Sequence, residues 1–333
     1  MEPATHTLTA YMMSRAGLRD WCPAATPVLL VAANVPDTDF AAWLGGDLAL
    51  LDWHRGPTHA LFFAALMAAL PLPALRFFLR RPFPWGRAYA VSLLGVLSHL
   101  ALDSTNIYGV RLLEPFSSRW VRLDIAAVVD LWLLAGLLAF AGWLFLSRLV
   151  SAEIGAAAGR GRRVAWAALA FAVLFLGGRY ALHARAVSVL ESFLYGGQAP
   201  VRVAALPRFA TPFSWVGLVE TRNAYHVLDI DLLSGNFDPA GGRTFYKPEP
   251  SPAIEAARRT ETYRRFSRFL QYEMWQVLPA PEPPGATEVE VMDMRFGLPG
   301  EGRFTARFLV DSAGRVLAQS FQYQPPGQRP RFR

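Results

Sequence analysis

Long apolar runs constrain this chain more than any other feature of its sequence. Four of them, at residues 58–79, 88–103, 124–147 and 164–182, hold few charged side chains. At a rise of about 1.5 Å per residue they would form helices of roughly 33, 24, 36 and 29 Å, against a hydrocarbon core of about 30 Å. We therefore predict four membrane-spanning helices in a mainly α-helical bundle. Two shorter runs, 6–19 and 24–36, predict an additional spanning hairpin, with a surface helix followed by a buried helix as the alternative.

The composition agrees with a protein of the lipid bilayer. Hydrophobic residues make up 53% of the 333 residues and charged residues only 18%, whereas globular chains average about 25% charged. This excludes a disordered chain, a coiled coil and most small soluble enzymes. The net charge of +7 comes from arginines in short clusters between the apolar runs, which is typical of membrane topology and not of a nucleic-acid partner. The single cysteine, Cys22, excludes an internal disulfide and a cysteine-based zinc site.

Arginine clusters predict the orientation of the helices. Two loops between the long runs should be cytoplasmic by the positive-inside rule; their arginines are Arg76, Arg80, Arg81, Arg87, Arg148, Arg160, Arg162 and Arg163. Residues 37–57, residues 104–123 and everything after about 183 then lie on the extracytoplasmic side of a bacterial inner membrane. The loop 104–123 also holds arginines, so the rule is not obeyed everywhere.

The character of the chain changes after the last apolar run, where proline, glycine and charged residues return. Alternating patterns predict strands at 215–221, 225–232, 287–296 and 303–310, with a hairpin turn at 311–314. Residues 252–278 predict one amphipathic helix that ends at Pro279. We therefore predict a membrane-embedded domain over 1–185, an extracytoplasmic α+β domain over 186–325 and a disordered tail over 326–333.

Histidines and aspartates gather at one membrane face if the chain passes up and down as predicted. Their side chains are the ligands that zinc, manganese or iron prefer. His99 and Asp103 are four residues apart and therefore share a helical face. Seven candidates exceed the need of one four-coordinate zinc ion, so we predict two divalent ions, zinc or else manganese or iron. The predicted ligands are His6, Asp37, Asp39, His54, His59, His99 and Asp103. Each of these side chains could instead cap a helix or pack in the core.

Further polar residues lie near this face and predict a supporting role. Arg55, Arg119 and Arg122 could hold a phosphate, with snorkelling toward the membrane interface as the alternative. Thr58 lies beside His59, where it could also cap a helix. Asp124 lies at the start of the third long run, and Asp130, about two turns inside it, could orient a ligand or line a solvated cavity.

Short motifs connect these residues to a known family. An N-terminal histidine, PDTDF at 36–40, HRGPTH at 54–59 and SHLALD at 98–103 resemble the YdjM-type family of inner-membrane metal-dependent hydrolases. The resemblance covers roughly residues 1–135, and the rest of the chain is similar to its longer, YfhP-like branch. It implies that the seven predicted ligands hold metal and that Arg55 and Thr58 belong to the same element. The sequence departs from the family at Ala60 and at Ser104-Thr105-Asn106, and the PD and H-x-x-x-D elements are also similar to those of zinc-dependent phospholipase C.

These observations predict a membrane-bound metal-dependent hydrolase that acts at the extracytoplasmic face. Metal-bound water would attack a lipid or lipid-linked substrate, with a phosphoester as the best match to the nearby arginines. Asp37, His59 and Asp103 are the predicted catalytic residues. The alternative is a membrane anchor with a structural metal site that presents the C-terminal domain as a binding module. A transporter is disfavoured because the charged residues cluster at the ends of the apolar runs.

Overall fold

The chain forms two compact units. The computed structural model describes residues 1–79, 82–155, 161–235, 237–280, 282–301 and 303–323. The helical unit comprises Met1–Asp39, Arg55–Arg185 and Pro207–Ser214. The β unit comprises Phe40–His54, Ala186–Leu206 and the chain from Trp215 onward. The tail predicted to be disordered, 326–333, lies outside the described residues.

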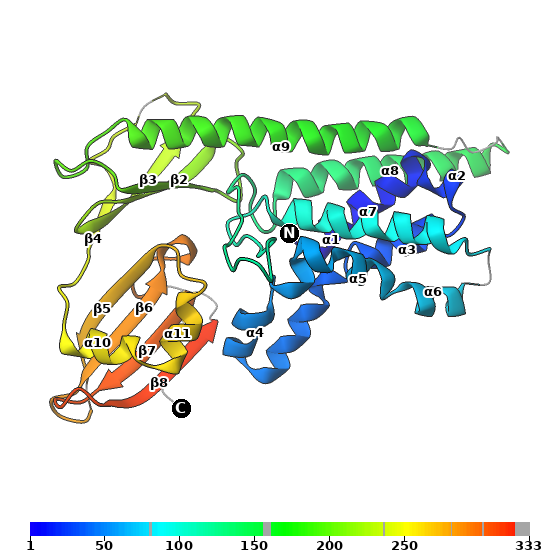
Figure 1. Cartoon of the computed structure of the whole chain (residues 1–333). Helices are drawn as coiled ribbons and strands as arrows, with labels where there is room; N and C mark the ends of the chain where they lie inside the picture. The colour runs from blue at the N-terminus through cyan, green and yellow to red at the C-terminus, as the bar shows by residue number, and fades with distance from the viewer. Residues whose placement is uncertain (80–81, 156–160, 236, 281, 302, 324–333) are drawn as a thin grey trace. The chain divides into compact units, whose positions relative to one another are not determined.

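Helices of the helical unit pack along one another (Figure 1). Apolar side chains of α1, α3 and α7 form one buried cluster, and those of α1, α8 and α9 form another. The helices are α1 (Pro3–Met13), α2 (Arg19–Trp21), α3 (Ala25–Ala32), α5 (Ala64–Ala69), α6 (Leu72–Phe78), α7 (Trp85–Asp103), α8 (Leu131–Glu153) and α9 (Arg162–Glu191). A π-helical turn, Ser14–Leu18, joins α1 to α2, and short 3-10 turns occupy Pro36–Gly45, Pro57–His59 and Leu61–Phe63.

Three helical segments in the described part of the chain are long and apolar enough to cross a membrane: Leu61–Phe78, Leu131–Glu153 and Arg162–Glu191. They correspond to three of the four predicted long runs. The fourth run forms α7, a helix of 19 residues that is not among these three. In the first segment, α5 ends before Pro71 and α6 begins after it, so the predicted single helix is interrupted. Crossing by the early hairpin stays a prediction, because α1 and α3 have only 11 and 8 residues.

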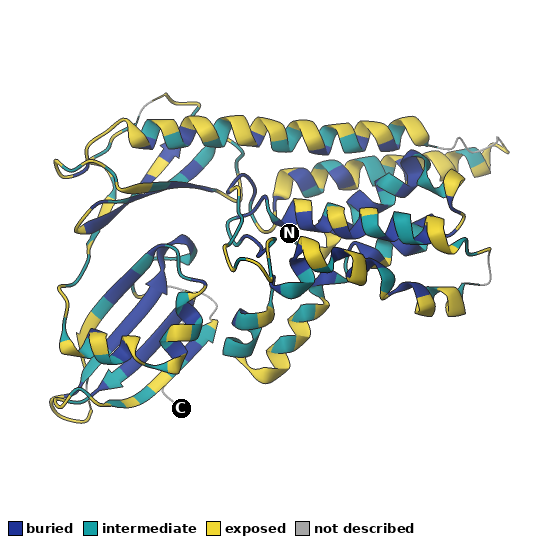
Figure 2. Cartoon of the chain, viewed as in Figure 1, coloured by how far each residue is buried: buried dark blue, intermediate teal, exposed yellow. Residues whose placement is uncertain are grey.

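Exposed residues are frequent along α8 and α9 (Figure 2), and many of them are large and apolar. They include Trp143, Phe145, Leu146, Val173 and Leu174, each more than half exposed. Large exposed apolar surfaces are unfavourable in water and match the hydrocarbon of a bilayer. These two helices therefore have the surface expected of lipid-facing elements.

The start of α8 differs from the prediction. Residues 124–130, predicted as the beginning of a helix, are not helical. Asp124 has a left-handed backbone (φ 54°), and the backbone N–H of Ile125 donates to the Thr105 carbonyl (2.9 Å). The Asp130 carboxylate caps α8 by accepting a hydrogen bond from the Leu133 N–H (3.1 Å). The prediction that Asp130 lies two turns inside a helix is therefore wrong.

Two four-stranded sheets form the framework of the β unit, each with its strands in sequence order. The strands are β1 (Arg202–Pro207), β2 (Ser214–Glu220), β3 (Ala224–Asp231), β4 (Arg243–Tyr246), β5 (Glu273–Pro279), β6 (Thr287–Asp293), β7 (Phe304–Val310) and β8 (Val316–Tyr323). The pairs from β5 to β8 are antiparallel, with Trp275 opposite Val291 and Val289 opposite Phe308. Helices α10 (Pro252–Arg258) and α11 (Glu261–Ser267) contact this sheet and bury Phe266 with it.

Residues 252–278 do not form the single helix that was predicted. Thr260 ends α10 and caps α11 by accepting a hydrogen bond from the Tyr263 N–H (3.2 Å). Residues after Gln271 form β5, whose side chains alternate between the two faces of the sheet. A further helix that the sequence did not suggest, α4 (Asp47–Trp53), joins the β unit: Asp52 accepts a hydrogen bond from the Arg265 Nε (2.6 Å).

Candidate metal centre

Four side chains from three separate segments converge inside the helical unit. Asp37 lies in the 3-10 segment after α3, His59 ends the turn Pro57–His59, and His99 and Asp103 share the last turns of α7. One ligand atom from each lies within 4.8 Å of the other three. His59, His99 and Asp103 are fully buried, whereas the Asp37 side chain is 22% exposed. The centre is thus buried except at the edge that Asp37 forms.

The facing atoms of this centre are electron-pair donors. His99 Nδ1 lies 2.7 Å from the Ala33 carbonyl, which can only accept, so this nitrogen carries the proton. His59 Nδ1 lies 3.1 Å from Asp39 Oδ2 in the same way. In the neutral rings both Nε2 atoms then hold lone pairs, yet they lie 3.1 Å apart. Such a pair is repulsive unless a cation lies between the atoms.

Carboxylate oxygens of Asp37 and Asp103 lie close to the same two Nε2 atoms. Asp37 Oδ1 lies 3.5 Å from the Nε2 atoms of both histidines, and Asp103 Oδ2 lies 3.4 and 3.5 Å from them. Two imidazoles and two carboxylates are a ligand set for zinc or another divalent transition metal. The residues therefore fit a metal ion.

Close packing of two helices sets the position of His99. A Cβ at Gly95 of α7 would lie 3.0 Å from the Ala32 Cβ and 3.3 Å from the Ala33 nitrogen. Glycine therefore lets α7 approach the end of α3 closely. That approach brings the Ala33 carbonyl within hydrogen-bond distance of His99, one helical turn further along α7.

Asp39 supports His59. Its Oδ2 lies 3.1 Å from the His59 Nδ1 and accepts hydrogen bonds from the Thr58 hydroxyl (2.6 Å) and the Arg55 N–H (2.8 Å). The four-residue centre does not include Asp39. Partners of this kind fix the tautomer and direction of a metal-binding histidine. Thr58 and Asp39 therefore have the geometry of orienting residues.

His6 of α1 also reaches the centre. Its ring stacks on the His99 ring with centroids 3.9 Å apart, and its Nε2 lies 3.3 Å from Asp103 Oδ1. Both of its ring nitrogens are buried without a hydrogen bond, as are both carboxylate oxygens of Asp103. The α-amino group of Met1 forms an ion pair with the same Asp103 oxygen.

Arg55 contacts Asp103 through its second carboxylate oxygen, Oδ2. Its guanidinium is buried, lies 3.3 Å from Asp103 Oδ2, and stacks over the Tyr108 ring at 4.8 Å. The sequence did not single out Asn106, whose fully buried Oδ1 accepts a hydrogen bond from the Arg55 Nη1 (3.0 Å). A polar residue three positions after the H-x-x-x-D motif was the sequence feature that could have indicated Asn106.

The other predicted residues have different surroundings. His54 belongs to the β unit, where its ring contacts the Phe40 ring at 5.9 Å, and it is not part of the four-residue centre. Arg122 forms an ion pair with Asp124, whereas Arg119 is exposed. Sequence analysis also overlooked Arg179, a buried arginine of α9 whose Nε donates to the Ile125 carbonyl (2.8 Å). A lone arginine within an apolar run was the signal for it.

Comparison with known proteins identifies the family of the chain. The model of the family described as YdjM inner membrane protein matches residues 1–186, which include every residue of the centre. The chain belongs to the YdjM family. Among curated proteins, the uncharacterized YfhP of Bacillus subtilis (strain 168) is 29% identical over 101 residues. That alignment covers 30% of the chain and 31% of YfhP, so the chain spans about a third of this relative. No solved structure matches the chain.

Replacing Asp39 tests the orienting role in this YdjM-family chain. We expect Asp39→Asn to weaken Zn²⁺ binding by roughly 10- to 100-fold, the range typical of lost orienting partners. Competition with a chromophoric chelator measures the affinity, and Thr58→Val should give a smaller loss in the same direction. A loss as complete as that of a ligand variant such as His59→Ala would instead make Asp39 a direct ligand.

Proposed function

We propose that the chain is a membrane-bound metal-dependent hydrolase whose centre is formed by Asp37, His59, His99 and Asp103. The observation that carries this proposal is the convergence of four ligand atoms within 4.8 Å from three segments of a helical unit. Membership of an inner-membrane family and three apolar helices place the chain in a bilayer. A divalent ion at this point would supply Lewis acidity and lower the pKa of water to about 7.

Protein groups around the centre suit a phosphoester substrate. Asp37, the one partly exposed member, lies where water and substrate would reach the centre, and its carboxylate can accept a hydrogen bond from the attacking water. Arg55 lies beside Asp103, and its buried Nε has no hydrogen-bond partner. A guanidinium here can neutralise a phosphoester oxygen. We assign His59 and Asp103, with Asp37, to the catalytic centre.

The two oxygens of Asp103 face different nitrogens, which supports a bridging role. Oδ2 faces the Nε2 atoms of His59 and His99 and the Arg55 guanidinium, whereas Oδ1 faces His6 and the α-amino group of Met1, which an ion would displace. A carboxylate placed in this way could serve two ions, with His6 as a ligand to the second one. We therefore propose two ions, most simply zinc. Elemental analysis giving two ions per chain supports this count, and one ion per chain contradicts it.

The proposed substrate is borne by lipid. A centre within a helical unit that has lipid-facing helices can reach phosphoesters at the level of the headgroups. We propose that the residues before about 185 form the hydrolase domain and that the β-rich C-terminal domain, over 186–325, lies on the extracytoplasmic side. There it would select or admit the substrate. Arginine placement in the sequence supports this orientation.

Asp37→Asn tests the catalytic proposal. Purified full-length protein loaded with Zn²⁺ or Mn²⁺ is assayed on phosphatidylglycerol, phosphatidylethanolamine, a polyprenyl phosphate ester and a soluble nitrophenyl phosphoester. We expect chelator-sensitive turnover and a loss of about 100-fold or more in Asp37→Asn, since both water access and charge balance change there. Asp229→Asn, at an exposed residue of β3, serves as control. Metal binding with no turnover on any substrate would favour a structural metal site. Burial of the other three ligands is also a feature of structural sites.

A further inference from the structure

We propose a second site in the helical unit, a pocket that binds a phosphate group. Among the residues that the structure describes, three arginines and no acidic residue line a cavity of about 400 Å³. Its lining residues are Tyr11, Arg15, Arg19, Thr26, Pro27, Leu79 and Arg148. The arginines come from the π-helical turn after α1, from α2 and from α8. This site shares no residue with the metal centre and does not depend on the proposed hydrolase activity.

Arg15 gives this cavity its binding character. The residue is only 4% exposed, and its Nε is buried without a hydrogen-bond partner. Within the described part of the chain, neither Arg15 nor Arg148 has a carboxylate as ion-pair partner. Asp20 acts on Arg15 only as a minor electrostatic influence, and a buried guanidinium without an ion-pair partner is costly, so the cavity favours an anion. The pocket is therefore positively charged and suited to bind an anion.

Helix lengths place this cavity at the opposite end of the helical unit from the metal centre. The α1 and α8 helices start side by side, since the Glu2 N–H donates to the Val128 carbonyl (3.1 Å). His6 is near the start of α1, and Arg15 follows nine residues later, about 13 Å along a helix. Arg148 lies 18 residues after the cap Asp130, about 27 Å along α8. Both arginines therefore lie away from the ends of α1 and α8 that hold His6 and Asp130.

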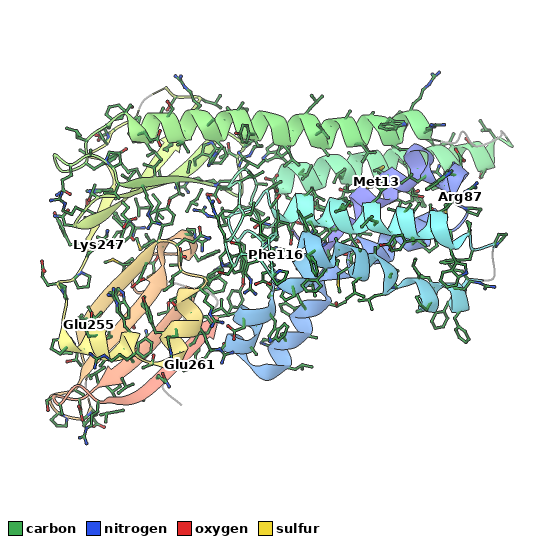
Figure 3. The ribbon with its side chains drawn as sticks, viewed as in Figure 1. Met13, Arg87, Phe116, Lys247, Glu255 and Glu261 are labelled. Carbon is green, nitrogen blue, oxygen red and sulfur yellow. The ribbon has the colours of Figure 1, made fainter. Side chains whose placement is uncertain are left out.

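The surroundings of the cavity suit a membrane interface. Arg87 lies beside α2 near one end of the helices (Figure 3). Arg87 stacks over the half-exposed Trp21 at 5.8 Å, and its Nη1 donates to the Trp21 carbonyl (3.1 Å). Tryptophan and arginine are enriched where lipid headgroups begin. A headgroup phosphate could therefore reach this cavity, and so could free phosphate from the adjacent water.

Phosphate matches the lining better than a smaller monovalent anion does. Guanidinium groups bind phosphate oxygens through paired N–H donors, and several of them can share one phosphate. The Tyr11 hydroxyl adds a donor at the wall of the cavity. Thr26 contributes less, since its hydroxyl already hydrogen-bonds the Ser14 hydroxyl (2.6 Å). The two candidate ligands, an anionic lipid and free phosphate, both present a phosphate group to the cavity.

Lipid and phosphate titrations of the delipidated full-length protein test this site. Native mass spectrometry measures retention of phosphatidylglycerol against phosphatidylcholine, and thermal unfolding measures stabilisation by inorganic phosphate. We expect Arg15→Gln and Arg148→Gln each to weaken the preferred ligand by about tenfold or more, since a charge-assisted hydrogen bond is lost. Arg163→Gln, at an exposed arginine outside the lining, should change the affinity by less than about twofold. Metal content measured in parallel shows that each variant is folded.

The outcomes separate the sources of the phosphate. Selective retention of phosphatidylglycerol that the lining variants lose identifies a lipid headgroup site. Stabilisation by inorganic phosphate alone, lost in the same variants, identifies a site for free phosphate. Equal loss in Arg15→Gln, Arg148→Gln and Arg163→Gln would reflect general surface charge and overturn the proposal. Binding of neither probe to the wild-type protein would overturn it as well.

Discussion

Alanine in place of His59 will remove the bound metal from the purified protein. The His59 Nε2 lies within 3.5 Å of ligand atoms from Asp37, His99 and Asp103, so its loss opens the middle of the centre. Because loss of an orienting partner alone weakens metal binding by roughly 10- to 100-fold, loss of this ligand should exceed 100-fold. Elemental analysis after dialysis against a weak chelator measures the remaining metal. Asp103→Asn should behave in the same way.

Two histidine variants make this result specific. His226→Ala changes a histidine of β3, whose Nδ1 hydrogen-bonds the Thr244 hydroxyl (3.0 Å), and should keep the full metal content. His54→Ala tests a ligand predicted from sequence that is not part of the four-residue centre, and we expect it to keep its metal also. Full metal content in His59→Ala would contradict the metal centre, provided that the variant folds. Loss of metal in His54→Ala would restore His54 as a ligand.

All four residues of the candidate centre are among the seven predicted ligands, because histidine and aspartate at such spacings are visible in the sequence. The spacing of His99 and Asp103 fixes them on one helical face whatever the rest of the fold, and HRGPTH places His59 beside Thr58. The same patterns do not reveal which carboxylate oxygen faces which nitrogen. Asp37 and Asp39 are equivalent in the sequence, yet only Asp37 joins the four ligand atoms while Asp39 faces His59 Nδ1. That difference depends on backbone direction within one 3-10 turn.

The fold was predictable where hydrophobicity decides it. Three long apolar runs match segments that could span a membrane, because their length and composition are sufficient evidence. The prediction failed where polar contacts decide instead. Apolar residues 125–129 continue the pattern of α8, but a carboxylate cap at Asp130 begins the helix later. In the β unit, β5 was included in a helix because its apolar residues also fit a helical period, and pairing with β6 determines its structure.

The second large effect is expected in the β unit, at the buried pair of Asp293 and Arg295. Both side chains are fully buried, and the guanidinium makes two hydrogen bonds to the carboxylate, Nε to Oδ1 (2.9 Å) and Nη2 to Oδ2 (2.7 Å). Arg295→Ala removes the charge partner and leaves a buried carboxylate that keeps only the backbone N–H donors of Gln271 and residue 295. Breaking such a pair costs about 3 to 5 kcal/mol. The full-length chain is unfolded in urea, and limited proteolysis is used to monitor unfolding of the β unit and so to measure this loss. Arg264→Ala, in an exposed ion pair with Glu261, should cost less than about 1 kcal/mol.

The pH dependence of the Arg295→Ala effect distinguishes a lost charge partner from lost packing. Burial raises the pKa of Asp293, but the charge and hydrogen bonds of Arg295 outweigh it and hold that pKa below its ordinary value. In the wild type the pair therefore stabilises the fold above about pH 4, and this contribution declines as the pH falls through the lowered pKa. In Arg295→Ala the backbone N–H groups of Gln271 and residue 295 still bind the carboxylate, but the guanidinium charge is gone, so the pKa of Asp293 is lowered less than in the wild type. The difference in unfolding free energy between the two proteins should consequently be largest near neutral pH and shrink below about pH 4. A difference that is the same at pH 7 and at about pH 2 would assign the effect to the contacts of Arg295 with the rings of Phe269 and Phe296, because those contacts do not titrate.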